Sequence, residues 1–286
     1  MAGYRAGEDV RLVQELLGLS LERLAEQCGV TRVTLSRWIA GKAVPSSGLL
    51  DAFYDYAYSR GVRLSKIKAQ LYREDCDSAR STVLFHGSKE GLEGAPSLAH
   101  GRDSCDFGRG FYCGESFEQA AMFVSSYPRS CVYACSLQTS GLRTECFSIE
   151  RDWMLAVALF RGKLDAYLGH PTLRAIRDRV ERADCVVAPI ADNRMFEIID
   201  SFADGELTDV QCSHCLSATD LGSQYVLRTN RAIEGLEILE RCHLCPLERA
   251  AYLEERSEST RVGRDKSKVA RRQYRNEGLY VEELLS

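Results

Sequence analysis

Apolar residues follow a helical period in the first part of this chain and a strand-like period afterwards. Between Val10 and Ser46 they fall three or four residues apart, with short turns between the groups, which predicts a cluster of short helices. The helical pattern continues to residue 74, and the polar stretch 73–81 predicts a domain boundary. Beyond it, short apolar runs predict strands at 82–88, 130–138, 184–190 and 223–229.

Amphipathic segments between these runs predict helices, so short strands and helices alternate irregularly in the second part of the chain. The predicted helices lie around 151–162, 172–182, 191–205, 207–216 and 230–242. The regular βαβ rhythm and the clustered GxGxxG of a Rossmann domain do not occur in the sequence. The pattern therefore predicts an α+β fold in which an all-α domain precedes a mixed one.

The stretch from Thr82 to Val124 brings glycine, aromatic and histidine residues to the ends of predicted strands. Its first residues, TVLFHGS, predict a strand that ends on His86 and opens into a turn at Gly87. DFGRGFYC follows, and then an amphipathic helix. Glycine lets main-chain amides approach a ligand and Tyr112 can stack on it, which favours a site for a flat, polar-edged ligand. The alternative is a hairpin whose aromatic residues belong to the core.

The N-terminal pattern is typical of a helix-turn-helix. Ser20 and Thr31 stand where helix N-caps are expected, and Gly29 lies in the turn between two helices. The turn LAEQCGV, the helix TLSRW and the exit GKAVPS resemble the Cro/C1-type phage repressors. The resemblance implies a DNA-binding domain over residues 1–75. Because such domains usually bind as dimers, it also implies a homodimer.

By the same resemblance, residues 32–39 form the helix that enters the major groove of DNA. Arg32, Val33 and Arg37 occupy the positions that face base edges, and arginine can offer two donors to guanine. Leu35 and Trp38 of the same helix point into the core. Leu21 departs from the family, which often has a DNA-contacting glutamine there. The alternative to DNA binding is a small helical domain that binds proteins.

Three pieces of the second part resemble the motifs of another family, in the same order. VLFHGS, FGRGFYCGESFEQAAMF and QYVLR resemble the NAD-binding motifs of the PARP-like (diphtheria-toxin-type) ADP-ribosyltransferases, in a bacterial branch of that fold. The resemblance implies an ADP-ribosyltransferase-like split β-sheet domain with helices over residues 80–250. A polar, basic C-terminal extension follows over 251–286, either a flexible solvated tail or a phosphate-binding segment.

This second resemblance implies a role for each matching residue. His86 would hydrogen-bond the adenosine ribose of NAD, and Gly87 would hold the nicotinamide carboxamide with its main chain. Tyr112 would stack on the nicotinamide ring, with Phe123 near a second stacking position. NAD is thus the implied substrate, and a rigid grip on nicotinamide suits cleavage through a positively charged ribose. The pocket walls would be shaped by Ser88 and Gly110.

The family's catalytic glutamate corresponds here to Gln224. A glutamine accepts a hydrogen bond, but it brings no charge and cannot act as a general base. We therefore expect no polymer extension, and transfer of a single ADP-ribose requires that the substrate or another carboxylate supply the charge. Asp192, after a predicted buried strand, is a candidate for that role, and a helix N-cap is its alternative. Arg194 is either a phosphate contact or a solvated side chain.

Composition and charge add limits to this picture. With 286 residues the chain is long enough for two domains. No apolar run approaches the ~20 residues of a membrane span, and the N-terminus lacks the apolar segment of a signal peptide. We therefore expect a cytoplasmic protein with no membrane association. The net charge of -4 confines any nucleic-acid binding to a local surface.

Cysteine is frequent, with 12 residues. Without a signal peptide this indicates reduced thiols rather than a disulfide framework. Two Cys-x-x-Cys pairs, at 212–215 and 242–245, formally match a zinc pattern. The first pair lies in a predicted helix, the second ends another, and a predicted strand separates them. We therefore expect no metal, with a structural zinc ion as the alternative.

These motifs support two main hypotheses of function. The first is a bacterial mono-ADP-ribosyltransferase that uses NAD to modify a protein or nucleic acid. A fused repressor-like domain fits a toxin–antitoxin or phage-defence protein, with an antitoxin protein as a further partner. The second is a transcription regulator whose transferase-like domain senses NAD or ADP-ribose without turnover, and Gln224 favours it. A third is a helix-turn-helix protein whose second domain only binds partners.

Overall fold

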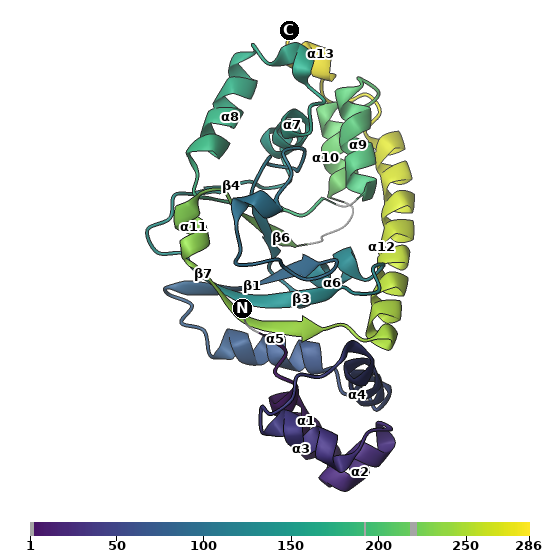
Figure 1. Cartoon of the computed structure of the whole chain (residues 1–286). Coiled ribbons are helices and arrows are strands. Elements are labelled where there is room, and N and C mark those ends of the chain that lie inside the picture. The colour runs from purple at the N-terminus through teal and green to yellow at the C-terminus, as the bar shows by residue number, and fades with distance from the viewer. Residues whose placement is uncertain (1–2, 192, 218–221) are drawn as a thin grey trace. The chain divides into compact units, whose positions relative to one another are not determined.

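The computed structural model describes residues 3–191, 193–217 and 222–286 (Figure 1). The chain forms two compact units, and each unit joins segments that are far apart in the sequence. Helices and strands occur in both, so the predicted α+β class is confirmed. Unit one comprises Met1–Gly94, Ser116–Ser136 and Glu237–Glu255, and unit two comprises Ala95–Glu115, Leu137–Leu236 and Arg256–Ser286.

Unit one begins with short helices that contain the predicted helix-turn-helix. The Ser20 hydroxyl accepts a hydrogen bond from the N–H of Arg23, and the Thr31 hydroxyl accepts one from Thr34, so both predicted N-caps are confirmed. Gly29, between the second and third helices, has a φ of 65°, a left-handed conformation that glycine adopts without strain. The helices are α1 (Ala6–Leu17), α2 (Leu21–Gln27), α3 (Arg32–Ile39), α4 (Ser47–Ser59) and α5 (Leu64–Glu74).

A buried apolar core holds these helices together. Leu24 of α2, Leu35 of α3 and Phe53 of α4 have no exposed surface. Trp38 of α3 meets Phe53 edge to face, with 6.2 Å between the ring centroids. The helical spacing of apolar residues in the sequence places these side chains on the buried faces of their helices, because positions three or four residues apart share one helix face.

The rest of unit one consists mainly of strands and the helix that covers one of them. Helix α6 (Phe117–Val124) packs against the first strand, and its Phe117 ring lies 5.8 Å from the ring of Phe85. Val124 is buried in the same cluster. The strands are β1 (Ser81–Ser88), β3 (Cys131–Gln138) and β7 (Leu236–His243), adjacent in this order.

The helix predicted over 230–242 is wrong beyond its first turns. Helix α11 ends at Glu234, and the following residues form β7. Its N-cap is Thr229, whose hydroxyl accepts a hydrogen bond from the N–H of Ala232. Gly235 weakens the helix at the break, and pairing with β3 satisfies the backbone groups of the residues after it. The helical spacing of the apolar residues was therefore overruled by strand pairing.

Unit two contains a mixed β-sheet with the order β4–β5–β6–β2. β4 runs parallel to β5, whereas β5–β6 and β6–β2 are antiparallel. Within β6, Gln224 stands opposite Ala188 of β5 on one side and Gly114 of β2 on the other. The strands are β4 (Thr144–Cys146), β5 (Cys185–Pro189), β6 (Ser223–Leu227) and β2 (Phe111–Gly114).

Helices surround one core in unit two. Trp153 and Phe202 have no exposed surface, and the whole run 153–159 of helix α7 is buried, as expected for a helix that is apolar on all sides. Among the described residues no helix combines the length and the apolar character needed to cross a membrane. The helices are α7 (Arg151–Phe160), α8 (Pro171–Arg182), α9 (Asn193–Ala203), α10 (Asp209–Leu216), α11 (Asn230–Glu234) and α13 (Val281–Leu284), with 3-10 turns at Leu98–His100 and Asp165–Tyr167.

The C-terminal extension is helical, which corrects the expectation of a flexible tail. Helix α12 runs over Pro246–Gln273 and is the long helix at the yellow-green end of the colour scale in Figure 1. Its second half, within unit two, packs on Arg194 of α9. Arg194 is only 3% exposed, and its Nη1 donates to the Cys215 carbonyl (3.2 Å) and the Ser267 hydroxyl (3.1 Å). Arg194 is therefore an internal contact and not a solvated side chain.

Candidate functional site

The second and third sequence motifs meet in unit two. Strand β2 carries the end of DFGRGFYCG, and β6 carries SQYVL; the two strands pair directly. The register sets Tyr112 opposite Val226 and Gly114 opposite Gln224. Asp106 in the loop before β2 lies 118 positions from Gln224 in the sequence, yet the two side chains are hydrogen-bonded. The candidate site is built around this contact.

The orientation of the Gln224 amide follows from its two partners. Nε2 donates to Oδ2 of Asp106 and to the carbonyl oxygen of Pro189, each at 3.1 Å. A carboxylate and a carbonyl only accept hydrogen bonds, so the amide must turn its nitrogen toward them. Both hydrogens of the nitrogen are then used. The carbonyl oxygen Oε1, which accepts no hydrogen bond from the described residues, is the atom left for a ligand.

Asp106 is the residue of this site that the sequence did not predict. It is 8% exposed, and its second oxygen, Oδ1, lies 3.5 Å from Nη1 of Arg161. Burial raises the pKa of Asp106 above its ordinary value, although the hydrogen bond from Gln224 and the charge of Arg161 act in the opposite direction. Its position directly before the glycine-aromatic run gave no signal of this role, because the burial of the carboxylate and its partner are set by the fold.

Tyr112 is held by the loop that precedes its own strand. Its hydroxyl donates to the carbonyl of Gly108 (2.7 Å) and accepts from the N–H of Phe107 (3.2 Å). Burial raises its pKa, so the phenol stays neutral at physiological pH. The ring is half-buried. At Gly110, a Cβ would lie 2.8 Å from Cγ1 of Val226, so this glycine permits the close approach of β2 to β6.

Two arginines hold the same loop. Arg228, just after β6, donates from Nη1 to the Phe107 carbonyl, and burial lowers its pKa. The Arg161 guanidinium lies over the ring of Phe196, 3.7 Å from its centroid, while it also faces Asp106. Two positively charged side chains thus hold neighbouring residues of the loop. Asp192, the carboxylate that the sequence offered for this site, lies outside the described residues.

The first motif lies in unit one, at the end of β1. His86 is half-buried, with its ring 6.4 Å from that of Tyr133. A Cβ on Gly87 would lie 2.5 Å from the carbonyl oxygen of Ala120, so only glycine lets α6 approach the strand this closely. Ser88 closes the following turn, because its hydroxyl accepts a hydrogen bond from Gly91. The predicted NAD contacts of these residues stay predictions.

Phe123 also belongs to unit one. Its side chain is 63% exposed on α6, whereas its neighbour Val124 is buried. An exposed phenylalanine is free of the core that α6 forms with β1, and its stacking role remains a prediction from the resemblance.

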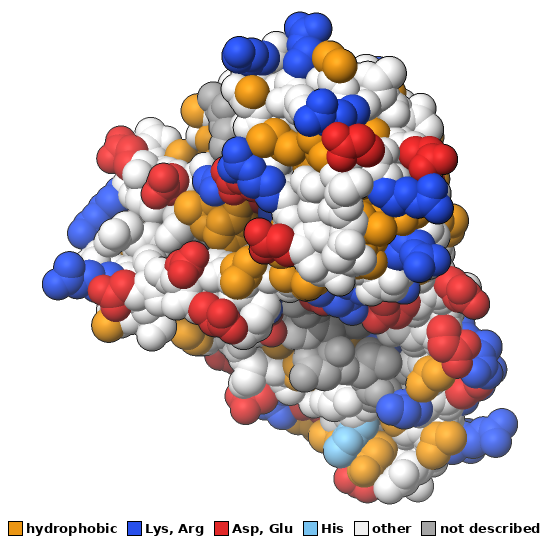
Figure 2. All heavy atoms as spheres, turned by 90° about the horizontal axis from the view of Figure 1, so that it is seen from below, with side chains coloured by type: hydrophobic (Ala, Val, Ile, Leu, Met, Phe, Trp, Pro, Cys, Tyr) orange, Lys and Arg blue, Asp and Glu red, His pale blue; other side chains and the backbone are white. Residues whose placement is uncertain are grey.

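The helix-turn-helix presents the residues that were expected to face DNA. Arg32, Val33 and Arg37 of α3 are all exposed, whereas the core takes the apolar residues between them. Arg32 forms an ion pair with Glu22 of α2, 2.5 Å between Nε and Oε1, and both side chains are more than half exposed. Leu21 is partly buried against the helical core. Figure 2 shows positive, negative and apolar side chains mixed on the face that it displays.

A second polar cluster lies inside unit one, between the helices and β7. Lys68 of α5 forms ion pairs with Asp9 of α1 (2.7 Å) and with Glu240 of β7. Tyr54 donates to Asp9 and Tyr72 to Glu240. Burial alone would lower the pKa of Lys68, but the two carboxylates raise it above its ordinary value. These charges join the helix-turn-helix to β7.

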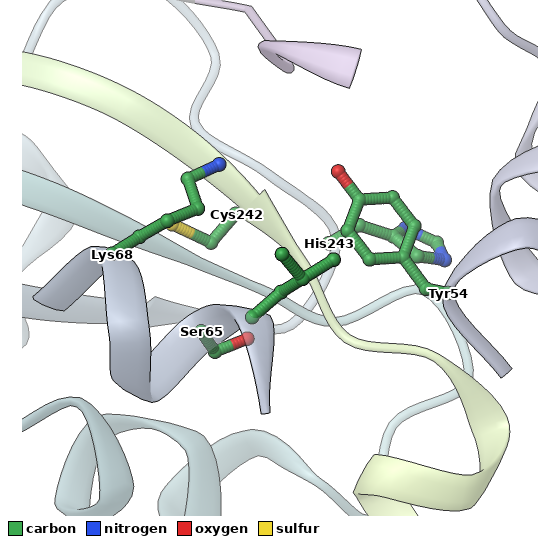
Figure 3. A pocket seen from close by; sticks show the side chains of 6 residues that line it. Tyr54, Ser65, Lys68, Cys242 and His243 are labelled. Carbon is green, nitrogen blue, oxygen red and sulfur yellow. The ribbon is translucent and has the colours of Figure 1, made fainter. Parts of the chain in front are cut away.

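A cavity beside this cluster is too small for a substrate. It has room for about one water molecule, ≈ 10 Å³. Figure 3 shows Lys68 and Ser65 extending from α5, and Tyr54 beside the His243 ring. Nε2 of His243 lies 2.8 Å from Oδ1 of Asp51, and burial lowers the pKa of this histidine despite that carboxylate. The cavity is a small packing gap where α4, α5 and β7 meet.

A wider surface hollow, of about 430 Å³, lies in unit two beside β4 and α8. Its arginines are already paired with carboxylates. Arg179 contacts Glu145 and Asp152, each at 2.6 Å, and Arg182 contacts Asp178 at 3.6 Å. The hollow therefore offers little uncompensated charge.

The cysteine pairs are buried thiols. Cys212 and Cys215 lie in α10 as expected, but Cys242 lies at the end of β7, where a helix end was predicted. Burial raises the pKa values of Cys212 and Cys242 well above their ordinary value, which opposes the thiolate that a metal needs. All twelve cysteines are free thiols. In the part of the chain that the structure describes, no three His, Cys, Asp or Glu residues gather to hold a metal ion.

Two family models match this chain. A helix-turn-helix model matches residues 11–53, which supports a DNA-binding element in the N-terminal helices. A model described as "Protein of unknown function (DUF3990)" matches residues 82–238, more than half of the chain. Comparison with curated proteins and with solved structures gave no match.

Proposed function

The chain belongs to the DUF3990 family of proteins of unknown function, and from that premise we propose that it transfers single ADP-ribose groups from NAD to a macromolecule. The proposal rests on the resemblance of the matched segment to the ADP-ribosyltransferase motifs. It is supported by the pairing of β2 with β6, which places the Tyr112 strand next to the Gln224 strand. A toxin–antitoxin or phage-defence setting is the context we propose for it.

The observation that carries the proposal is the fixed amide of Gln224. A buried glutamine with both N–H groups tied to acceptors keeps Oε1 aimed at one place without further loss of side-chain freedom. An acceptor held in this way suits the 2′-hydroxyl of a ribose. It gives Gln224 the orienting half of the role that glutamate has in the resembling family, without the charge.

The reaction balances without any further reagent. The bond between C1′ of the ribose and the nicotinamide nitrogen breaks, and nicotinamide leaves with the electron pair. A nucleophilic oxygen or nitrogen of the acceptor forms the new bond to C1′ and releases a proton to solvent. Developing positive charge on the ribose is the part that the protein must stabilise. Tyr112, whose hydroxyl is tied to the loop, would present its ring to the nicotinamide as a stable platform.

The test is nicotinamide release. Purified protein is incubated with NAD and with radiolabelled NAD plus cell lysate, and nicotinamide and labelled macromolecules are measured. We expect release above the spontaneous rate, and a Tyr112→Ala variant that is at least about tenfold slower. Tyr280→Ala, a half-exposed tyrosine of unit two, is the control with unchanged rate. A fully active Tyr112→Ala protein refutes this site.

The second candidate function is a regulator that binds DNA and senses NAD or ADP-ribose. The exposed Arg32, Val33 and Arg37 face favours it, because it provides a DNA-binding output. The distinguishing result is NAD binding without nicotinamide release, combined with DNA affinity that changes when NAD is added. A protein that neither binds NAD nor releases nicotinamide refutes both functions.

A further inference from the structure

We propose that Asp106 supplies the negative charge that Gln224 lacks, so that Asp106 and Gln224 together take the part of one catalytic carboxylate. This inference rests on the proposed function. It makes Asp106 a positioning residue, which acts on the ribose through Gln224 and through its electrostatic field.

The first support is the geometry of the pair. Asp106 Oδ2 and Gln224 Nε2 are 3.1 Å apart, and both residues are less than 10% exposed. The hydrogen bond that the amide donates to the carboxylate polarises the amide, which places more negative charge on Oε1. A ribose that becomes positive next to Oε1 therefore meets both the amide dipole and the carboxylate behind it. Water is largely excluded, so the field is weakly screened.

The second support is the identity of residue 224. A glutamate there would direct a carboxylate at Asp106 and at the Pro189 carbonyl, where only acceptors lie. Two carboxylates in such contact cannot both stay ionised. A glutamine is therefore the side chain that this pocket accepts while Asp106 keeps its charge. The proposal thus explains both why position 224 lacks the expected glutamate and why Asp106 is buried beside it.

Arg161 limits the charge without cancelling it. Its Nη1 contacts Oδ1 of Asp106 at 3.5 Å, which is long for a charge-assisted hydrogen bond, and its guanidinium also lies over Phe196. Oδ2 is the oxygen that faces Gln224. The carboxylate thus has one oxygen toward Arg161 and one toward the proposed site.

The alternative is a purely structural bond that ties the loop before β2 to β6. An asparagine at position 106 separates the two, because its Oδ1 can accept the same hydrogen bond from Gln224 but carries no charge. If the contact is only structural, Asp106→Asn keeps full activity. If the charge acts on the reaction, the turnover falls while NAD binding persists.

The experiment measures kcat and KM for nicotinamide release in the full chain, with melting temperatures recorded in parallel. We expect Asp106→Asn to lower kcat about 100-fold and to change KM less than threefold. Asp103→Asn is the matched control, since Asp103 lies in the same loop, exposed and paired with Arg109. We expect its kcat to equal that of the wild type.

The charge swap provides a second test. In Asp106→Asn/Gln224→Glu the charge returns at the adjacent position, with the asparagine amide as its donor, and we expect at least a tenfold recovery of kcat over Asp106→Asn alone. If Asp106→Asn melts at a lower temperature than the wild type, the kcat of the double variant decides between the two interpretations. Recovery supports the proposal, and a kcat that stays at the single-variant level refutes it.

The outcomes separate this inference from the proposed function. Wild-type protein that releases no nicotinamide refutes the transferase and with it the role of Asp106. Active wild-type protein with an equally active Asp106→Asn variant refutes the role of Asp106 alone.

Discussion

Replacement of Gln224 by glutamate is the most informative change to the stability of unit two. It sets two carboxylates against each other at the 3.1 Å contact between residues 106 and 224. At an effective dielectric constant of about 20, two charges at that distance repel by about 5 kcal/mol. Protonation of one carboxyl with an ordinary pKa of about 4.3 costs only about 3.7 kcal/mol at pH 7. Since protonation is cheaper, we expect the folded variant to hold one shared proton and to lose up to about 3.7 kcal/mol of stability.

The sign of the pH dependence follows. The shared carboxyl has a higher pKa in the folded variant than in its unfolded chain, so the folded state binds the extra proton. The variant is therefore least affected at low pH, and its deficit relative to the wild type grows as pH rises through the folded pKa. At pH 5.5 the same protonation costs only about 1.6 kcal/mol. The deficit should thus differ by about 2 kcal/mol between pH 5.5 and pH 7.

The assay is urea unfolding followed by tryptophan fluorescence. The chain has two tryptophans, Trp38 in the helix-turn-helix and Trp153 in the core of unit two. A Trp38→Phe background leaves Trp153 as the reporter of the unit that contains Gln224. Gln224→Glu is compared at both pH values with the same change in an Asp106→Asn protein, in which the deficit should no longer grow with pH. An equal deficit at both pH values, or none at pH 7, refutes the reasoning.

The other predictions concern unit one. Lys68→Met leaves its two carboxylate partners buried without a counter-charge and should cost about 3–5 kcal/mol in urea unfolding, whereas Lys66→Met, an exposed pair, should cost less than about 0.5. Equal costs would refute the buried network. Thr31→Ala removes the N-cap of α3 and should lower stability by about 1 kcal/mol, read by tryptophan fluorescence. Arg37→Ala should weaken binding of a DNA duplex by about 1–3 kcal/mol in anisotropy titrations, and Arg60→Ala, at the end of α4, should not; similar losses would show that the DNA face is wrongly assigned.

The helix-turn-helix could be predicted because its determinants are local. Ser20, Gly29 and Thr31 act on the backbone within three residues of themselves, and the apolar spacing selects the buried helix face. The same applies to β1, β3, β5 and β6, which the sequence marks as short apolar runs. Residues 236–242 were predicted as helix, because the hydrogen bonds that make them a strand come from β3, far away in the chain.

The candidate site divides in the same way. Tyr112 could be found from the glycine and aromatic residues at its strand end, which indicate a ligand site without any knowledge of the fold. Gln224 could be found only through the resemblance of its strand to the third motif of the transferase family. Asp106 could not, because its significance comes from a partner 118 positions away. The buried charges of Asp9, Lys68 and Glu240 were missed for the same reason.

The sequence by itself therefore determined the helix-turn-helix, the α+β class and the glycine-aromatic run before Tyr112, all of which depend on neighbours within a few positions. Only the tertiary structure decided that Gln224 faces a carboxylate and that its amide must turn its nitrogen toward Asp106 and the Pro189 carbonyl. The physical reason is that hydrogen bonds and charges act over a few ångströms in space, whatever their separation along the chain. In the sequence, glutamine at position 224 means the loss of the charge that the resemblance leads us to expect. In the fold, that glutamine is in contact with the carboxylate of Asp106.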